Sequence, residues 1–172
     1  MDITQLILDD HAEQRKLFAM IEEIGANKRQ ALKPVWQRLK ALLDTHAEAE
    51  ERYFYPDVLK VGVGANDGES ADAETKHAIK DHNEIRDTAA EVDKHDIGSS
   101  DWFAALGKCN EANSKHMGEE ERQGLTDIRA QASLERRHDL AVTFAAFESA
   151  HLLGVEPVDK DPSEYVKRNE PD

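Results

Sequence analysis

The chain has 172 residues, of which 39% are apolar and 34% are charged, and its formal charge at pH 7 is −14. This composition fits one domain of amphipathic helices with solvated outer faces. The acidic balance argues against nucleic-acid binding, because a phosphate backbone would be repelled and no basic stripe offsets the total. The sequence contains no run of 18 apolar residues and no secretion signal at its start, so we expect a cytoplasmic protein.

The predicted elements are helices throughout. The first, residues 2–25, carries apolar side chains at helical spacing, with His11 on the same stripe four residues after Ile7. The second, residues 30–59, is followed by a glycine-rich loop over residues 61–70 that includes Gly68.

The second half of the chain repeats this plan. The third helix is predicted over residues 71–95 and the fourth over residues 101–132. The single cysteine, Cys109, excludes a disulfide within the chain and is expected to be a small buried apolar residue.

These elements predict an all-α fold, an up-down antiparallel four-helix bundle over residues 1–132. Residues 133–153 form a predicted additional C-terminal helix. We expect it to pack on the bundle, although it could instead offer a homodimer or protein-partner surface. Residues 154–172 contain three prolines and many charges, which favours a loosely ordered, flexible tail.

Two short motifs each occur twice. The pattern D-H-x-E-x-R begins at Asp10 and again at Asp81, and the pattern H-x-x-x-E-E begins at His46 and again at His116. The four histidines, His11, His46, His82 and His116, are therefore separated by 35, 36 and 34 residues. Because each helix and its connection take about 35 residues, this spacing places the histidines at similar depth in an antiparallel bundle.

The spacing within the motifs adds two carboxylates to the same interior. Glu50 and Glu120 each follow a histidine by four residues, so each pair shares one helix face. Buried imidazoles and carboxylates without partners are unfavourable, and two metal ions bridged by carboxylates would satisfy them. Nitrogen and oxygen donors without thiolates suit iron, manganese or zinc. The predicted metal ligands are His11, His46, Glu50, His82, His116 and Glu120.

Two tyrosines follow the second motif. Tyr53 lies on the stripe of His46 and Glu50, so its phenolate could complete a ferric coordination sphere, or its hydroxyl could be hydrogen-bonded in the interior. Tyr55 is a second candidate, because the helix can unwind just before Pro56. Arg15 and Arg86 follow His11 and His82 by four residues, where they either orient carboxylates near the site or are solvated.

The six ligand positions and the segment from Glu50 to Pro56 resemble the hemerythrin-like, HHE cation-binding family of bacterial type. The resemblance covers about residues 1–130. It implies a non-haem di-iron centre, with two iron ions that are oxo- or hydroxo-bridged. It also implies that the six residues above are its ligands.

The chain departs from the oxygen-carrying hemerythrins of invertebrates, which place H-x-x-x-H on the third helix. Here His77 and His82 are five residues apart, about 140° around a helix, so both cannot easily point inward. His82 fits the repeated motif, and we expect His77 on the helix surface, with an approach to the site as the alternative.

Fewer histidine ligands leave more open metal positions, which favours reactivity with oxygen species over simple oxygen carriage. The resemblance therefore implies peroxide decomposition, catalase-like or peroxidase-like, or a role in oxidative stress. The alternative is a module that binds O2 or NO reversibly, or senses iron or oxygen, without turnover. The expected partners are small molecules, namely O2, H2O2 or NO.

Overall fold

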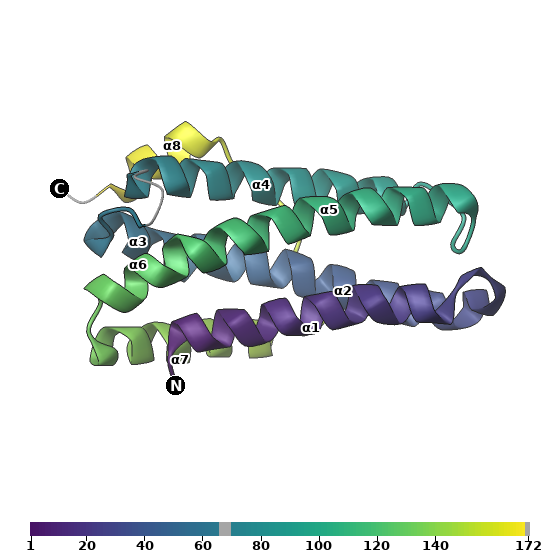
Figure 1. Cartoon of the computed structure of the whole chain (residues 1–172), viewed down its shortest axis with the longest axis horizontal. Helices are drawn as coiled ribbons and strands as arrows, with labels where there is room; N and C mark the ends of the chain where they lie inside the picture. Colours follow the sequence, from purple (N-terminus) through teal and green to yellow (C-terminus); the bar gives the residue numbers. More distant parts are fainter. Residues whose placement is uncertain (66–69, 171–172) are drawn as a thin grey trace.

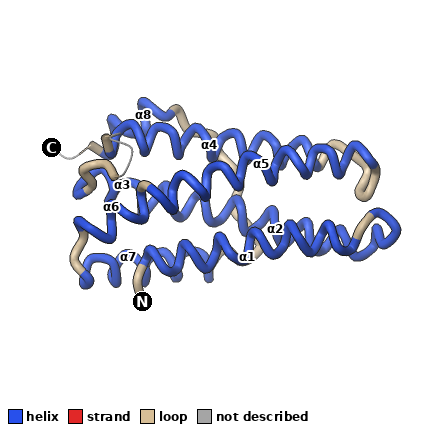
Figure 2. The backbone as a smooth tube through the Cα atoms, in the orientation of Figure 1, coloured by secondary structure: helices blue, strands red, loops and turns tan. Residues whose placement is uncertain are grey.

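The computed structural model describes residues 1–65 and 70–170, and these residues contain helices and no strands. Residues 66–69, which include Gly68 of the expected glycine-rich loop, and residues 171–172 lie outside the described part. Nearly all of the described backbone is helical, with short connections between the helices (Figure 2). The helices are α1 (Ile3–Ile24), α2 (Arg29–Ala49), α3 (Tyr55–Val61), α4 (Ala71–Val92), α5 (Ser100–Arg122), α6 (Gly124–Gln131), α7 (Leu134–Ala150) and α8 (Pro162–Asn169).

The long helices α1, α2, α4 and α5 form an antiparallel bundle, as the sequence predicts (Figure 1). The α1–α2 and α4–α5 connections lie at one end of this bundle, and α3, α6 and the N-terminus lie at the other (Figure 1). Side-chain caps fix the starts of several helices: Asp2 accepts from the backbone N–H of Thr4, and Ser99 accepts from that of Trp102. Gly25 ends α1 with φ = 66°, a conformation that favours glycine.

The apolar core consists of two clusters at opposite ends of the bundle. One, near the helix connections, includes Trp36 and Trp102, and the other includes Phe54 and Phe144. Between them lies a layer of buried polar side chains at mid-height of the long helices. This layer includes His11, Gln14, His46, Glu50, His82, Asn113, His116 and Glu120.

Two helices that the sequence predicts as continuous are interrupted at this level. Between α2 and α3 the backbone forms a π-helical turn over Glu50–Phe54, in which the N–H of Tyr55 bonds to the carbonyl of Glu50. Between α5 and α6 the helix breaks at Gln123, with φ = −106° and ψ = −85°. The break is accompanied by close packing at Gly124, where a Cβ atom would lie 2.7 Å from Glu74 Oε1.

The C-terminal part of the chain lies on two sides of the bundle. Helix α7 packs beside α1 and α2, and α8 packs on α4 across the bundle from it (Figure 1). The expectation of a loosely ordered tail therefore needs correction for α8. Asp161 caps this helix, and its Tyr165 and Val166 side chains are buried against the bundle. The many charges and the prolines of this segment favour a prediction of disorder, and the buried apolar side chains of Tyr165 and Val166 outweigh them.

Candidate metal centre

The polar layer brings together all six side chains that the sequence singles out. His11 comes from α1, His46 from α2, Glu50 from the π-helical turn and His82 from α4, while α5 contributes His116 and Glu120. Each of the six residues has at most 4% of its surface exposed.

The first group consists of His11, His46, Glu50 and Glu120, each of which offers one atom within 4.8 Å of the others. His11 Nε2 lies 3.2 Å from Glu120 Oε2, and His46 Nε2 lies 2.9 Å from Glu50 Oε1. Three helical elements and the π-helical turn therefore supply four donors at one point.

The second group consists of Glu50, His82 and His116. His82 Nε2 lies 3.1 Å from Glu50 Oε2 and 3.0 Å from His116 Nε2. Glu50 thus belongs to both groups: its Oε1 atom faces His46, and its Oε2 atom faces the other two histidines. A carboxylate in this arrangement can bridge two cations.

The donor atoms fit bound cations better than they fit one another. Buried atoms without a hydrogen-bond partner include Nε2 of His11 and His46, both carboxylate oxygens of Glu50, and Oε2 of Glu120. Leaving such atoms unpaired is unfavourable, and a cation would pair them. A nitrogen and an oxygen donor that each lie about 2.1 Å from a metal, at right angles around it, are about 3 Å apart. The donor separations of 2.9 to 3.2 Å match this value.

The second glutamate of each E-E doublet orients a histidine from another helix. His11 Nδ1 lies 2.9 Å from Glu121 Oε1, which also accepts from Arg15 at 2.6 Å. A donated Nδ1–H leaves Nε2 as the free lone pair, the arrangement that a metal-binding histidine needs.

The same arrangement recurs in the other half of the bundle. His82 Nδ1 lies 2.8 Å from Glu51 Oε1, which also accepts from Arg86 at 2.7 Å. Both arginines therefore contact carboxylates beside the site, although the Arg15 side chain is also 47% exposed, whereas that of Arg86 is buried. Glu51 and Glu121 are not among the residues predicted from the sequence, although the repeated E-E doublet was the available signal.

The environment of His46 includes a residue from outside the four-helix bundle. His46 Nδ1 lies 3.2 Å from Asp10 Oδ2 and 3.7 Å from Glu148 Oε1 on α7. Asp10 is the first residue of the D-H-x-E-x-R motif, whereas Glu148 belongs to no motif and could not be recognised from the sequence.

The π-helical turn decides between the two tyrosines. An α-helix would keep Tyr53 on the stripe of Glu50, but the extra residue of the turn rotates Tyr55 inward instead. The Tyr55 hydroxyl is buried and donates to Glu120 Oε1 at 2.6 Å, whereas the half-buried Tyr53 ring packs on Phe147. Tyr53 is therefore away from the metal groups, and Tyr55 is the tyrosine that contacts one of their carboxylates.

The remaining candidate, His77, lies exposed on α4, and it is in none of the metal-type groups found among the described residues. This placement agrees with the expectation that His82, rather than His77, points inward.

The buried charges predict how pH affects the metal-free protein. Burial disfavours the charged form of His82, but the Glu50 carboxylate 3.1 Å from its Nε2 atom and the hydrogen bond with Glu51 outweigh it and raise the pKa of His82 to about 9. This stabilisation is complete below the ordinary pKa of 6.5 and is lost as pH rises through about 9. We expect the free energy of unfolding to fall by up to about 3 kcal/mol over that range.

At acidic pH, the free energy of unfolding changes with pH in the opposite direction because of Glu51. Burial opposes ionisation of Glu51, but the hydrogen bond from His82 and the charge of Arg86 lower its pKa to about 2. Its contribution is present above pH 4.5 and is lost as pH falls through about 2. Urea unfolding in the presence of a chelator, measured from about pH 2 to about pH 9, tests both effects. An equal free energy of unfolding at pH 6.5 and at pH 9 would contradict the effect predicted for His82.

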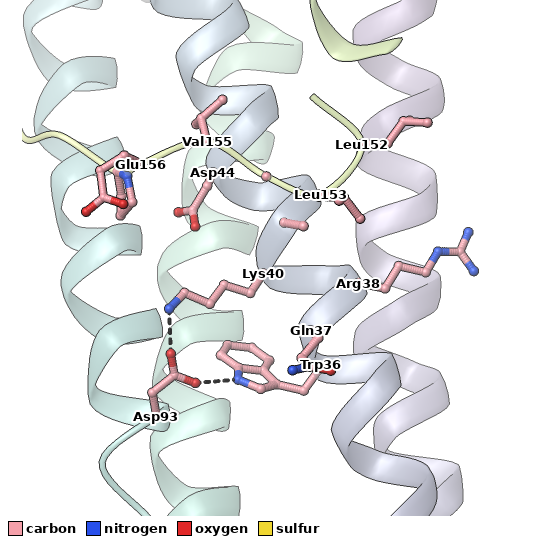
Figure 3. Close-up of a pocket in the computed structure, with 13 residues that line it drawn as sticks. Trp36, Gln37, Arg38, Lys40, Asp44, Asp93, Leu152, Leu153, Val155 and Glu156 are labelled. Atoms are coloured by element: carbon pink, nitrogen blue, oxygen red, sulfur yellow. Dashed lines mark hydrogen bonds and ion pairs between the residues drawn. The ribbon is translucent and has the colours of Figure 1, made fainter. Parts of the chain in front are cut away.

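A surface pocket of about 730 Å³ lies elsewhere, between α2 and residues 152–157 (Figure 3). Within it, the Trp36 indole N–H and the Lys40 ammonium both bond to the Asp93 carboxylate. Its lining residues include none of the six converging side chains, so the pocket is not part of the metal centre.

Fold and site together define a helical-bundle protein whose buried histidine and glutamate clusters fit a metal site. The model of the hemerythrin HHE cation-binding domain matches residues 2–126, and the chain belongs to this family. No curated protein and no solved structure matches the chain. Among the described helices, none is long and apolar enough to cross a membrane.

Proposed function

We propose that the protein is a non-haem di-iron protein that decomposes hydrogen peroxide. One observation carries the proposal: both oxygens of Glu50 lack hydrogen bonds, and each faces a different histidine-containing group. The donors are imidazole nitrogens and carboxylate oxygens, which suit iron, and membership of the cation-binding family supports that choice.

The two groups differ in a way that favours reaction with an external molecule. The first offers four residues, whereas the second offers Glu50, His82 and His116 alone. A metal in the second group would keep more positions open for a small molecule. When bound, the iron pair supplies the electron exchange and the Lewis acidity that peroxide decomposition requires.

The protein itself supplies a proton and a dry environment. Burial and the neighbouring carboxylates of Glu120 and Glu50 hold the pKa of Tyr55 well above its usual range, so its hydroxyl stays protonated at neutral pH. The hydroxyl donates to Glu120 Oε1, which places a transferable proton at the edge of the first group. The apolar clusters on both sides of the polar layer keep bulk water out.

Oxygen evolution from peroxide by the iron-loaded protein tests the proposal. Two peroxide molecules should yield two waters and one O2, and His82→Ala should abolish the activity because it removes a ligand of the second group. Tyr55→Phe should keep both irons but lower the rate by about 100-fold, the usual scale for a lost proton donor. Tyr53→Phe is the matched control, because it removes a hydroxyl that lies away from both groups.

An iron-loaded protein that does not react with peroxide would overturn the proposed activity. A stable oxygenated spectrum after reduction would instead support reversible O2 binding.

A further inference from the structure

The chain beyond the matched residues 2–126 returns to the metal centre. After α7 it crosses the bundle to reach α8 on the far face (Figure 1). On this crossing, the Lys160 ammonium lies 2.7 Å from Glu48 Oε2 and also contacts Glu51 Oε2. Glu51 is the residue whose other oxygen meets His82.

Lys160 is held in place through the residue that follows His82. The Asn83 side-chain amide donates to the Lys160 carbonyl at 2.8 Å, and its oxygen accepts from the Lys160 N–H at 3.1 Å. Further along, the buried Tyr165 donates its hydroxyl to the backbone carbonyl of Glu51. Backbone and side-chain contacts therefore fix this segment against α4 and the π-helical turn.

The two halves of the bundle differ at this point. In the first half, Glu121 contacts His11 and Arg15, and its side chain is 28% exposed. In the second half, the Glu51 side chain is 0% exposed and meets Lys160 in addition to His82 and Arg86. One Glu51 oxygen is held by His82 and Arg86, and the other by Lys160, so the carboxylate cannot rotate without breaking an ion pair.

We propose that Lys160 is a positioning residue for the metal position formed by Glu50, His82 and His116. By fixing Glu51, Lys160 holds the His82 ring so that its Nε2 atom faces that position. The inference rests on the proposed metal binding but not on peroxide turnover. A contact that favours metal binding is favoured by the metal in return, so metal loading should also tighten the segment around Lys160.

Metal titration of the full chain tests the role of Lys160. Lys160→Met keeps most of the apolar stem but removes the charge. We expect the affinity for the second iron to fall about 10-fold, the scale of lost outer contacts at metal sites, while the affinity for the first iron stays unchanged. Lys160→Arg keeps the charge and should restore most of the affinity.

Arg52→Met is the matched control, because Arg52 pairs with Glu48 at 2.6 Å but is not a described partner of Glu51. Hydrogen exchange gives an independent measurement. Iron should slow amide exchange around residues 157–166 in the unchanged protein, and this protection should shrink in Lys160→Met.

The outcomes separate this proposal from the proposed function. Equal second-iron affinity in Lys160→Met and the unchanged protein would overturn the role of Lys160, as would an equal loss in Arg52→Met. If the unchanged protein binds no iron, the proposed di-iron centre is wrong. Should Lys160→Met not fold, Lys160→Gln provides the same comparison, because it also removes the charge that meets Glu51.

Discussion

Replacing Glu50 by glutamine should weaken binding of both metal ions rather than one. The carboxylate is shared: Oε1 faces His46 and Oε2 faces His82, so no other described side chain contributes to both groups. Glutamine keeps the volume but removes the negative charge and directs an N–H donor at one group. We expect each affinity to fall by more than ~100-fold, beyond the range typical of outer contacts.

Metal analysis after loading with iron measures this effect. We expect two ions per chain in the unchanged protein and fewer than one in Glu50→Gln. The matched control is Glu91→Gln, because it makes the same chemical change on a side chain of α4 that is 47% exposed and lies in none of the metal-type groups among the described residues. A Glu50→Gln protein that keeps one ion at full affinity would contradict the shared position of this carboxylate.

Removing the metal should lower thermal stability substantially. The metal-free protein buries nitrogen and oxygen atoms of His11, His46, Glu50 and Glu120 without hydrogen bonds. A cation that binds only the folded state adds about 4 kcal/mol at a concentration of about 1,000 times Kd. For a chain of this length, that corresponds to an increase in Tm of roughly 10 °C.

Calorimetry with iron and with excess chelator measures this difference. His46→Ala removes a donor of the first group, so most of the iron-dependent increase should disappear. His95→Ala, at a histidine that is in none of the metal-type groups among the described residues, should retain the full increase. Identical Tm values for the unchanged protein with iron and with chelator would contradict a metal that binds in the polar layer.

The bundle and the convergence of the six side chains could be predicted because both depend on spacing along the chain. Helical periodicity places His46 and Glu50 on one face, and the interval of about 35 residues places His11 and His82 at the same depth. The repeated motifs also favoured His82 over His77, in agreement with the placement of His77 on the surface.

The parts that could not be predicted depend on backbone irregularity or on distant segments. Tyr55, rather than Tyr53, contacts the polar layer because a π-helical turn adds one residue between Glu50 and the start of α3. Periodicity of an α-helix cannot anticipate this extra residue. Glu148 and Lys160 reach the site through the packing of segments more than 100 residues from the histidine or glutamate that they contact. No local pattern marks either residue.

The division of the core into two clusters affects what optical signals can report. Both tryptophans, Trp36 and Trp102, lie in the cluster near the helix connections, with ring centroids 6.2 Å apart. The other cluster contains no tryptophan and packs against the π-helical turn and α7. Intrinsic fluorescence therefore observes the half of the molecule that is farther from the N-terminus, whereas circular dichroism averages over both halves. If loss of metal loosens the end of the bundle that holds the N-terminus, circular dichroism should detect the change, whereas tryptophan fluorescence should change little.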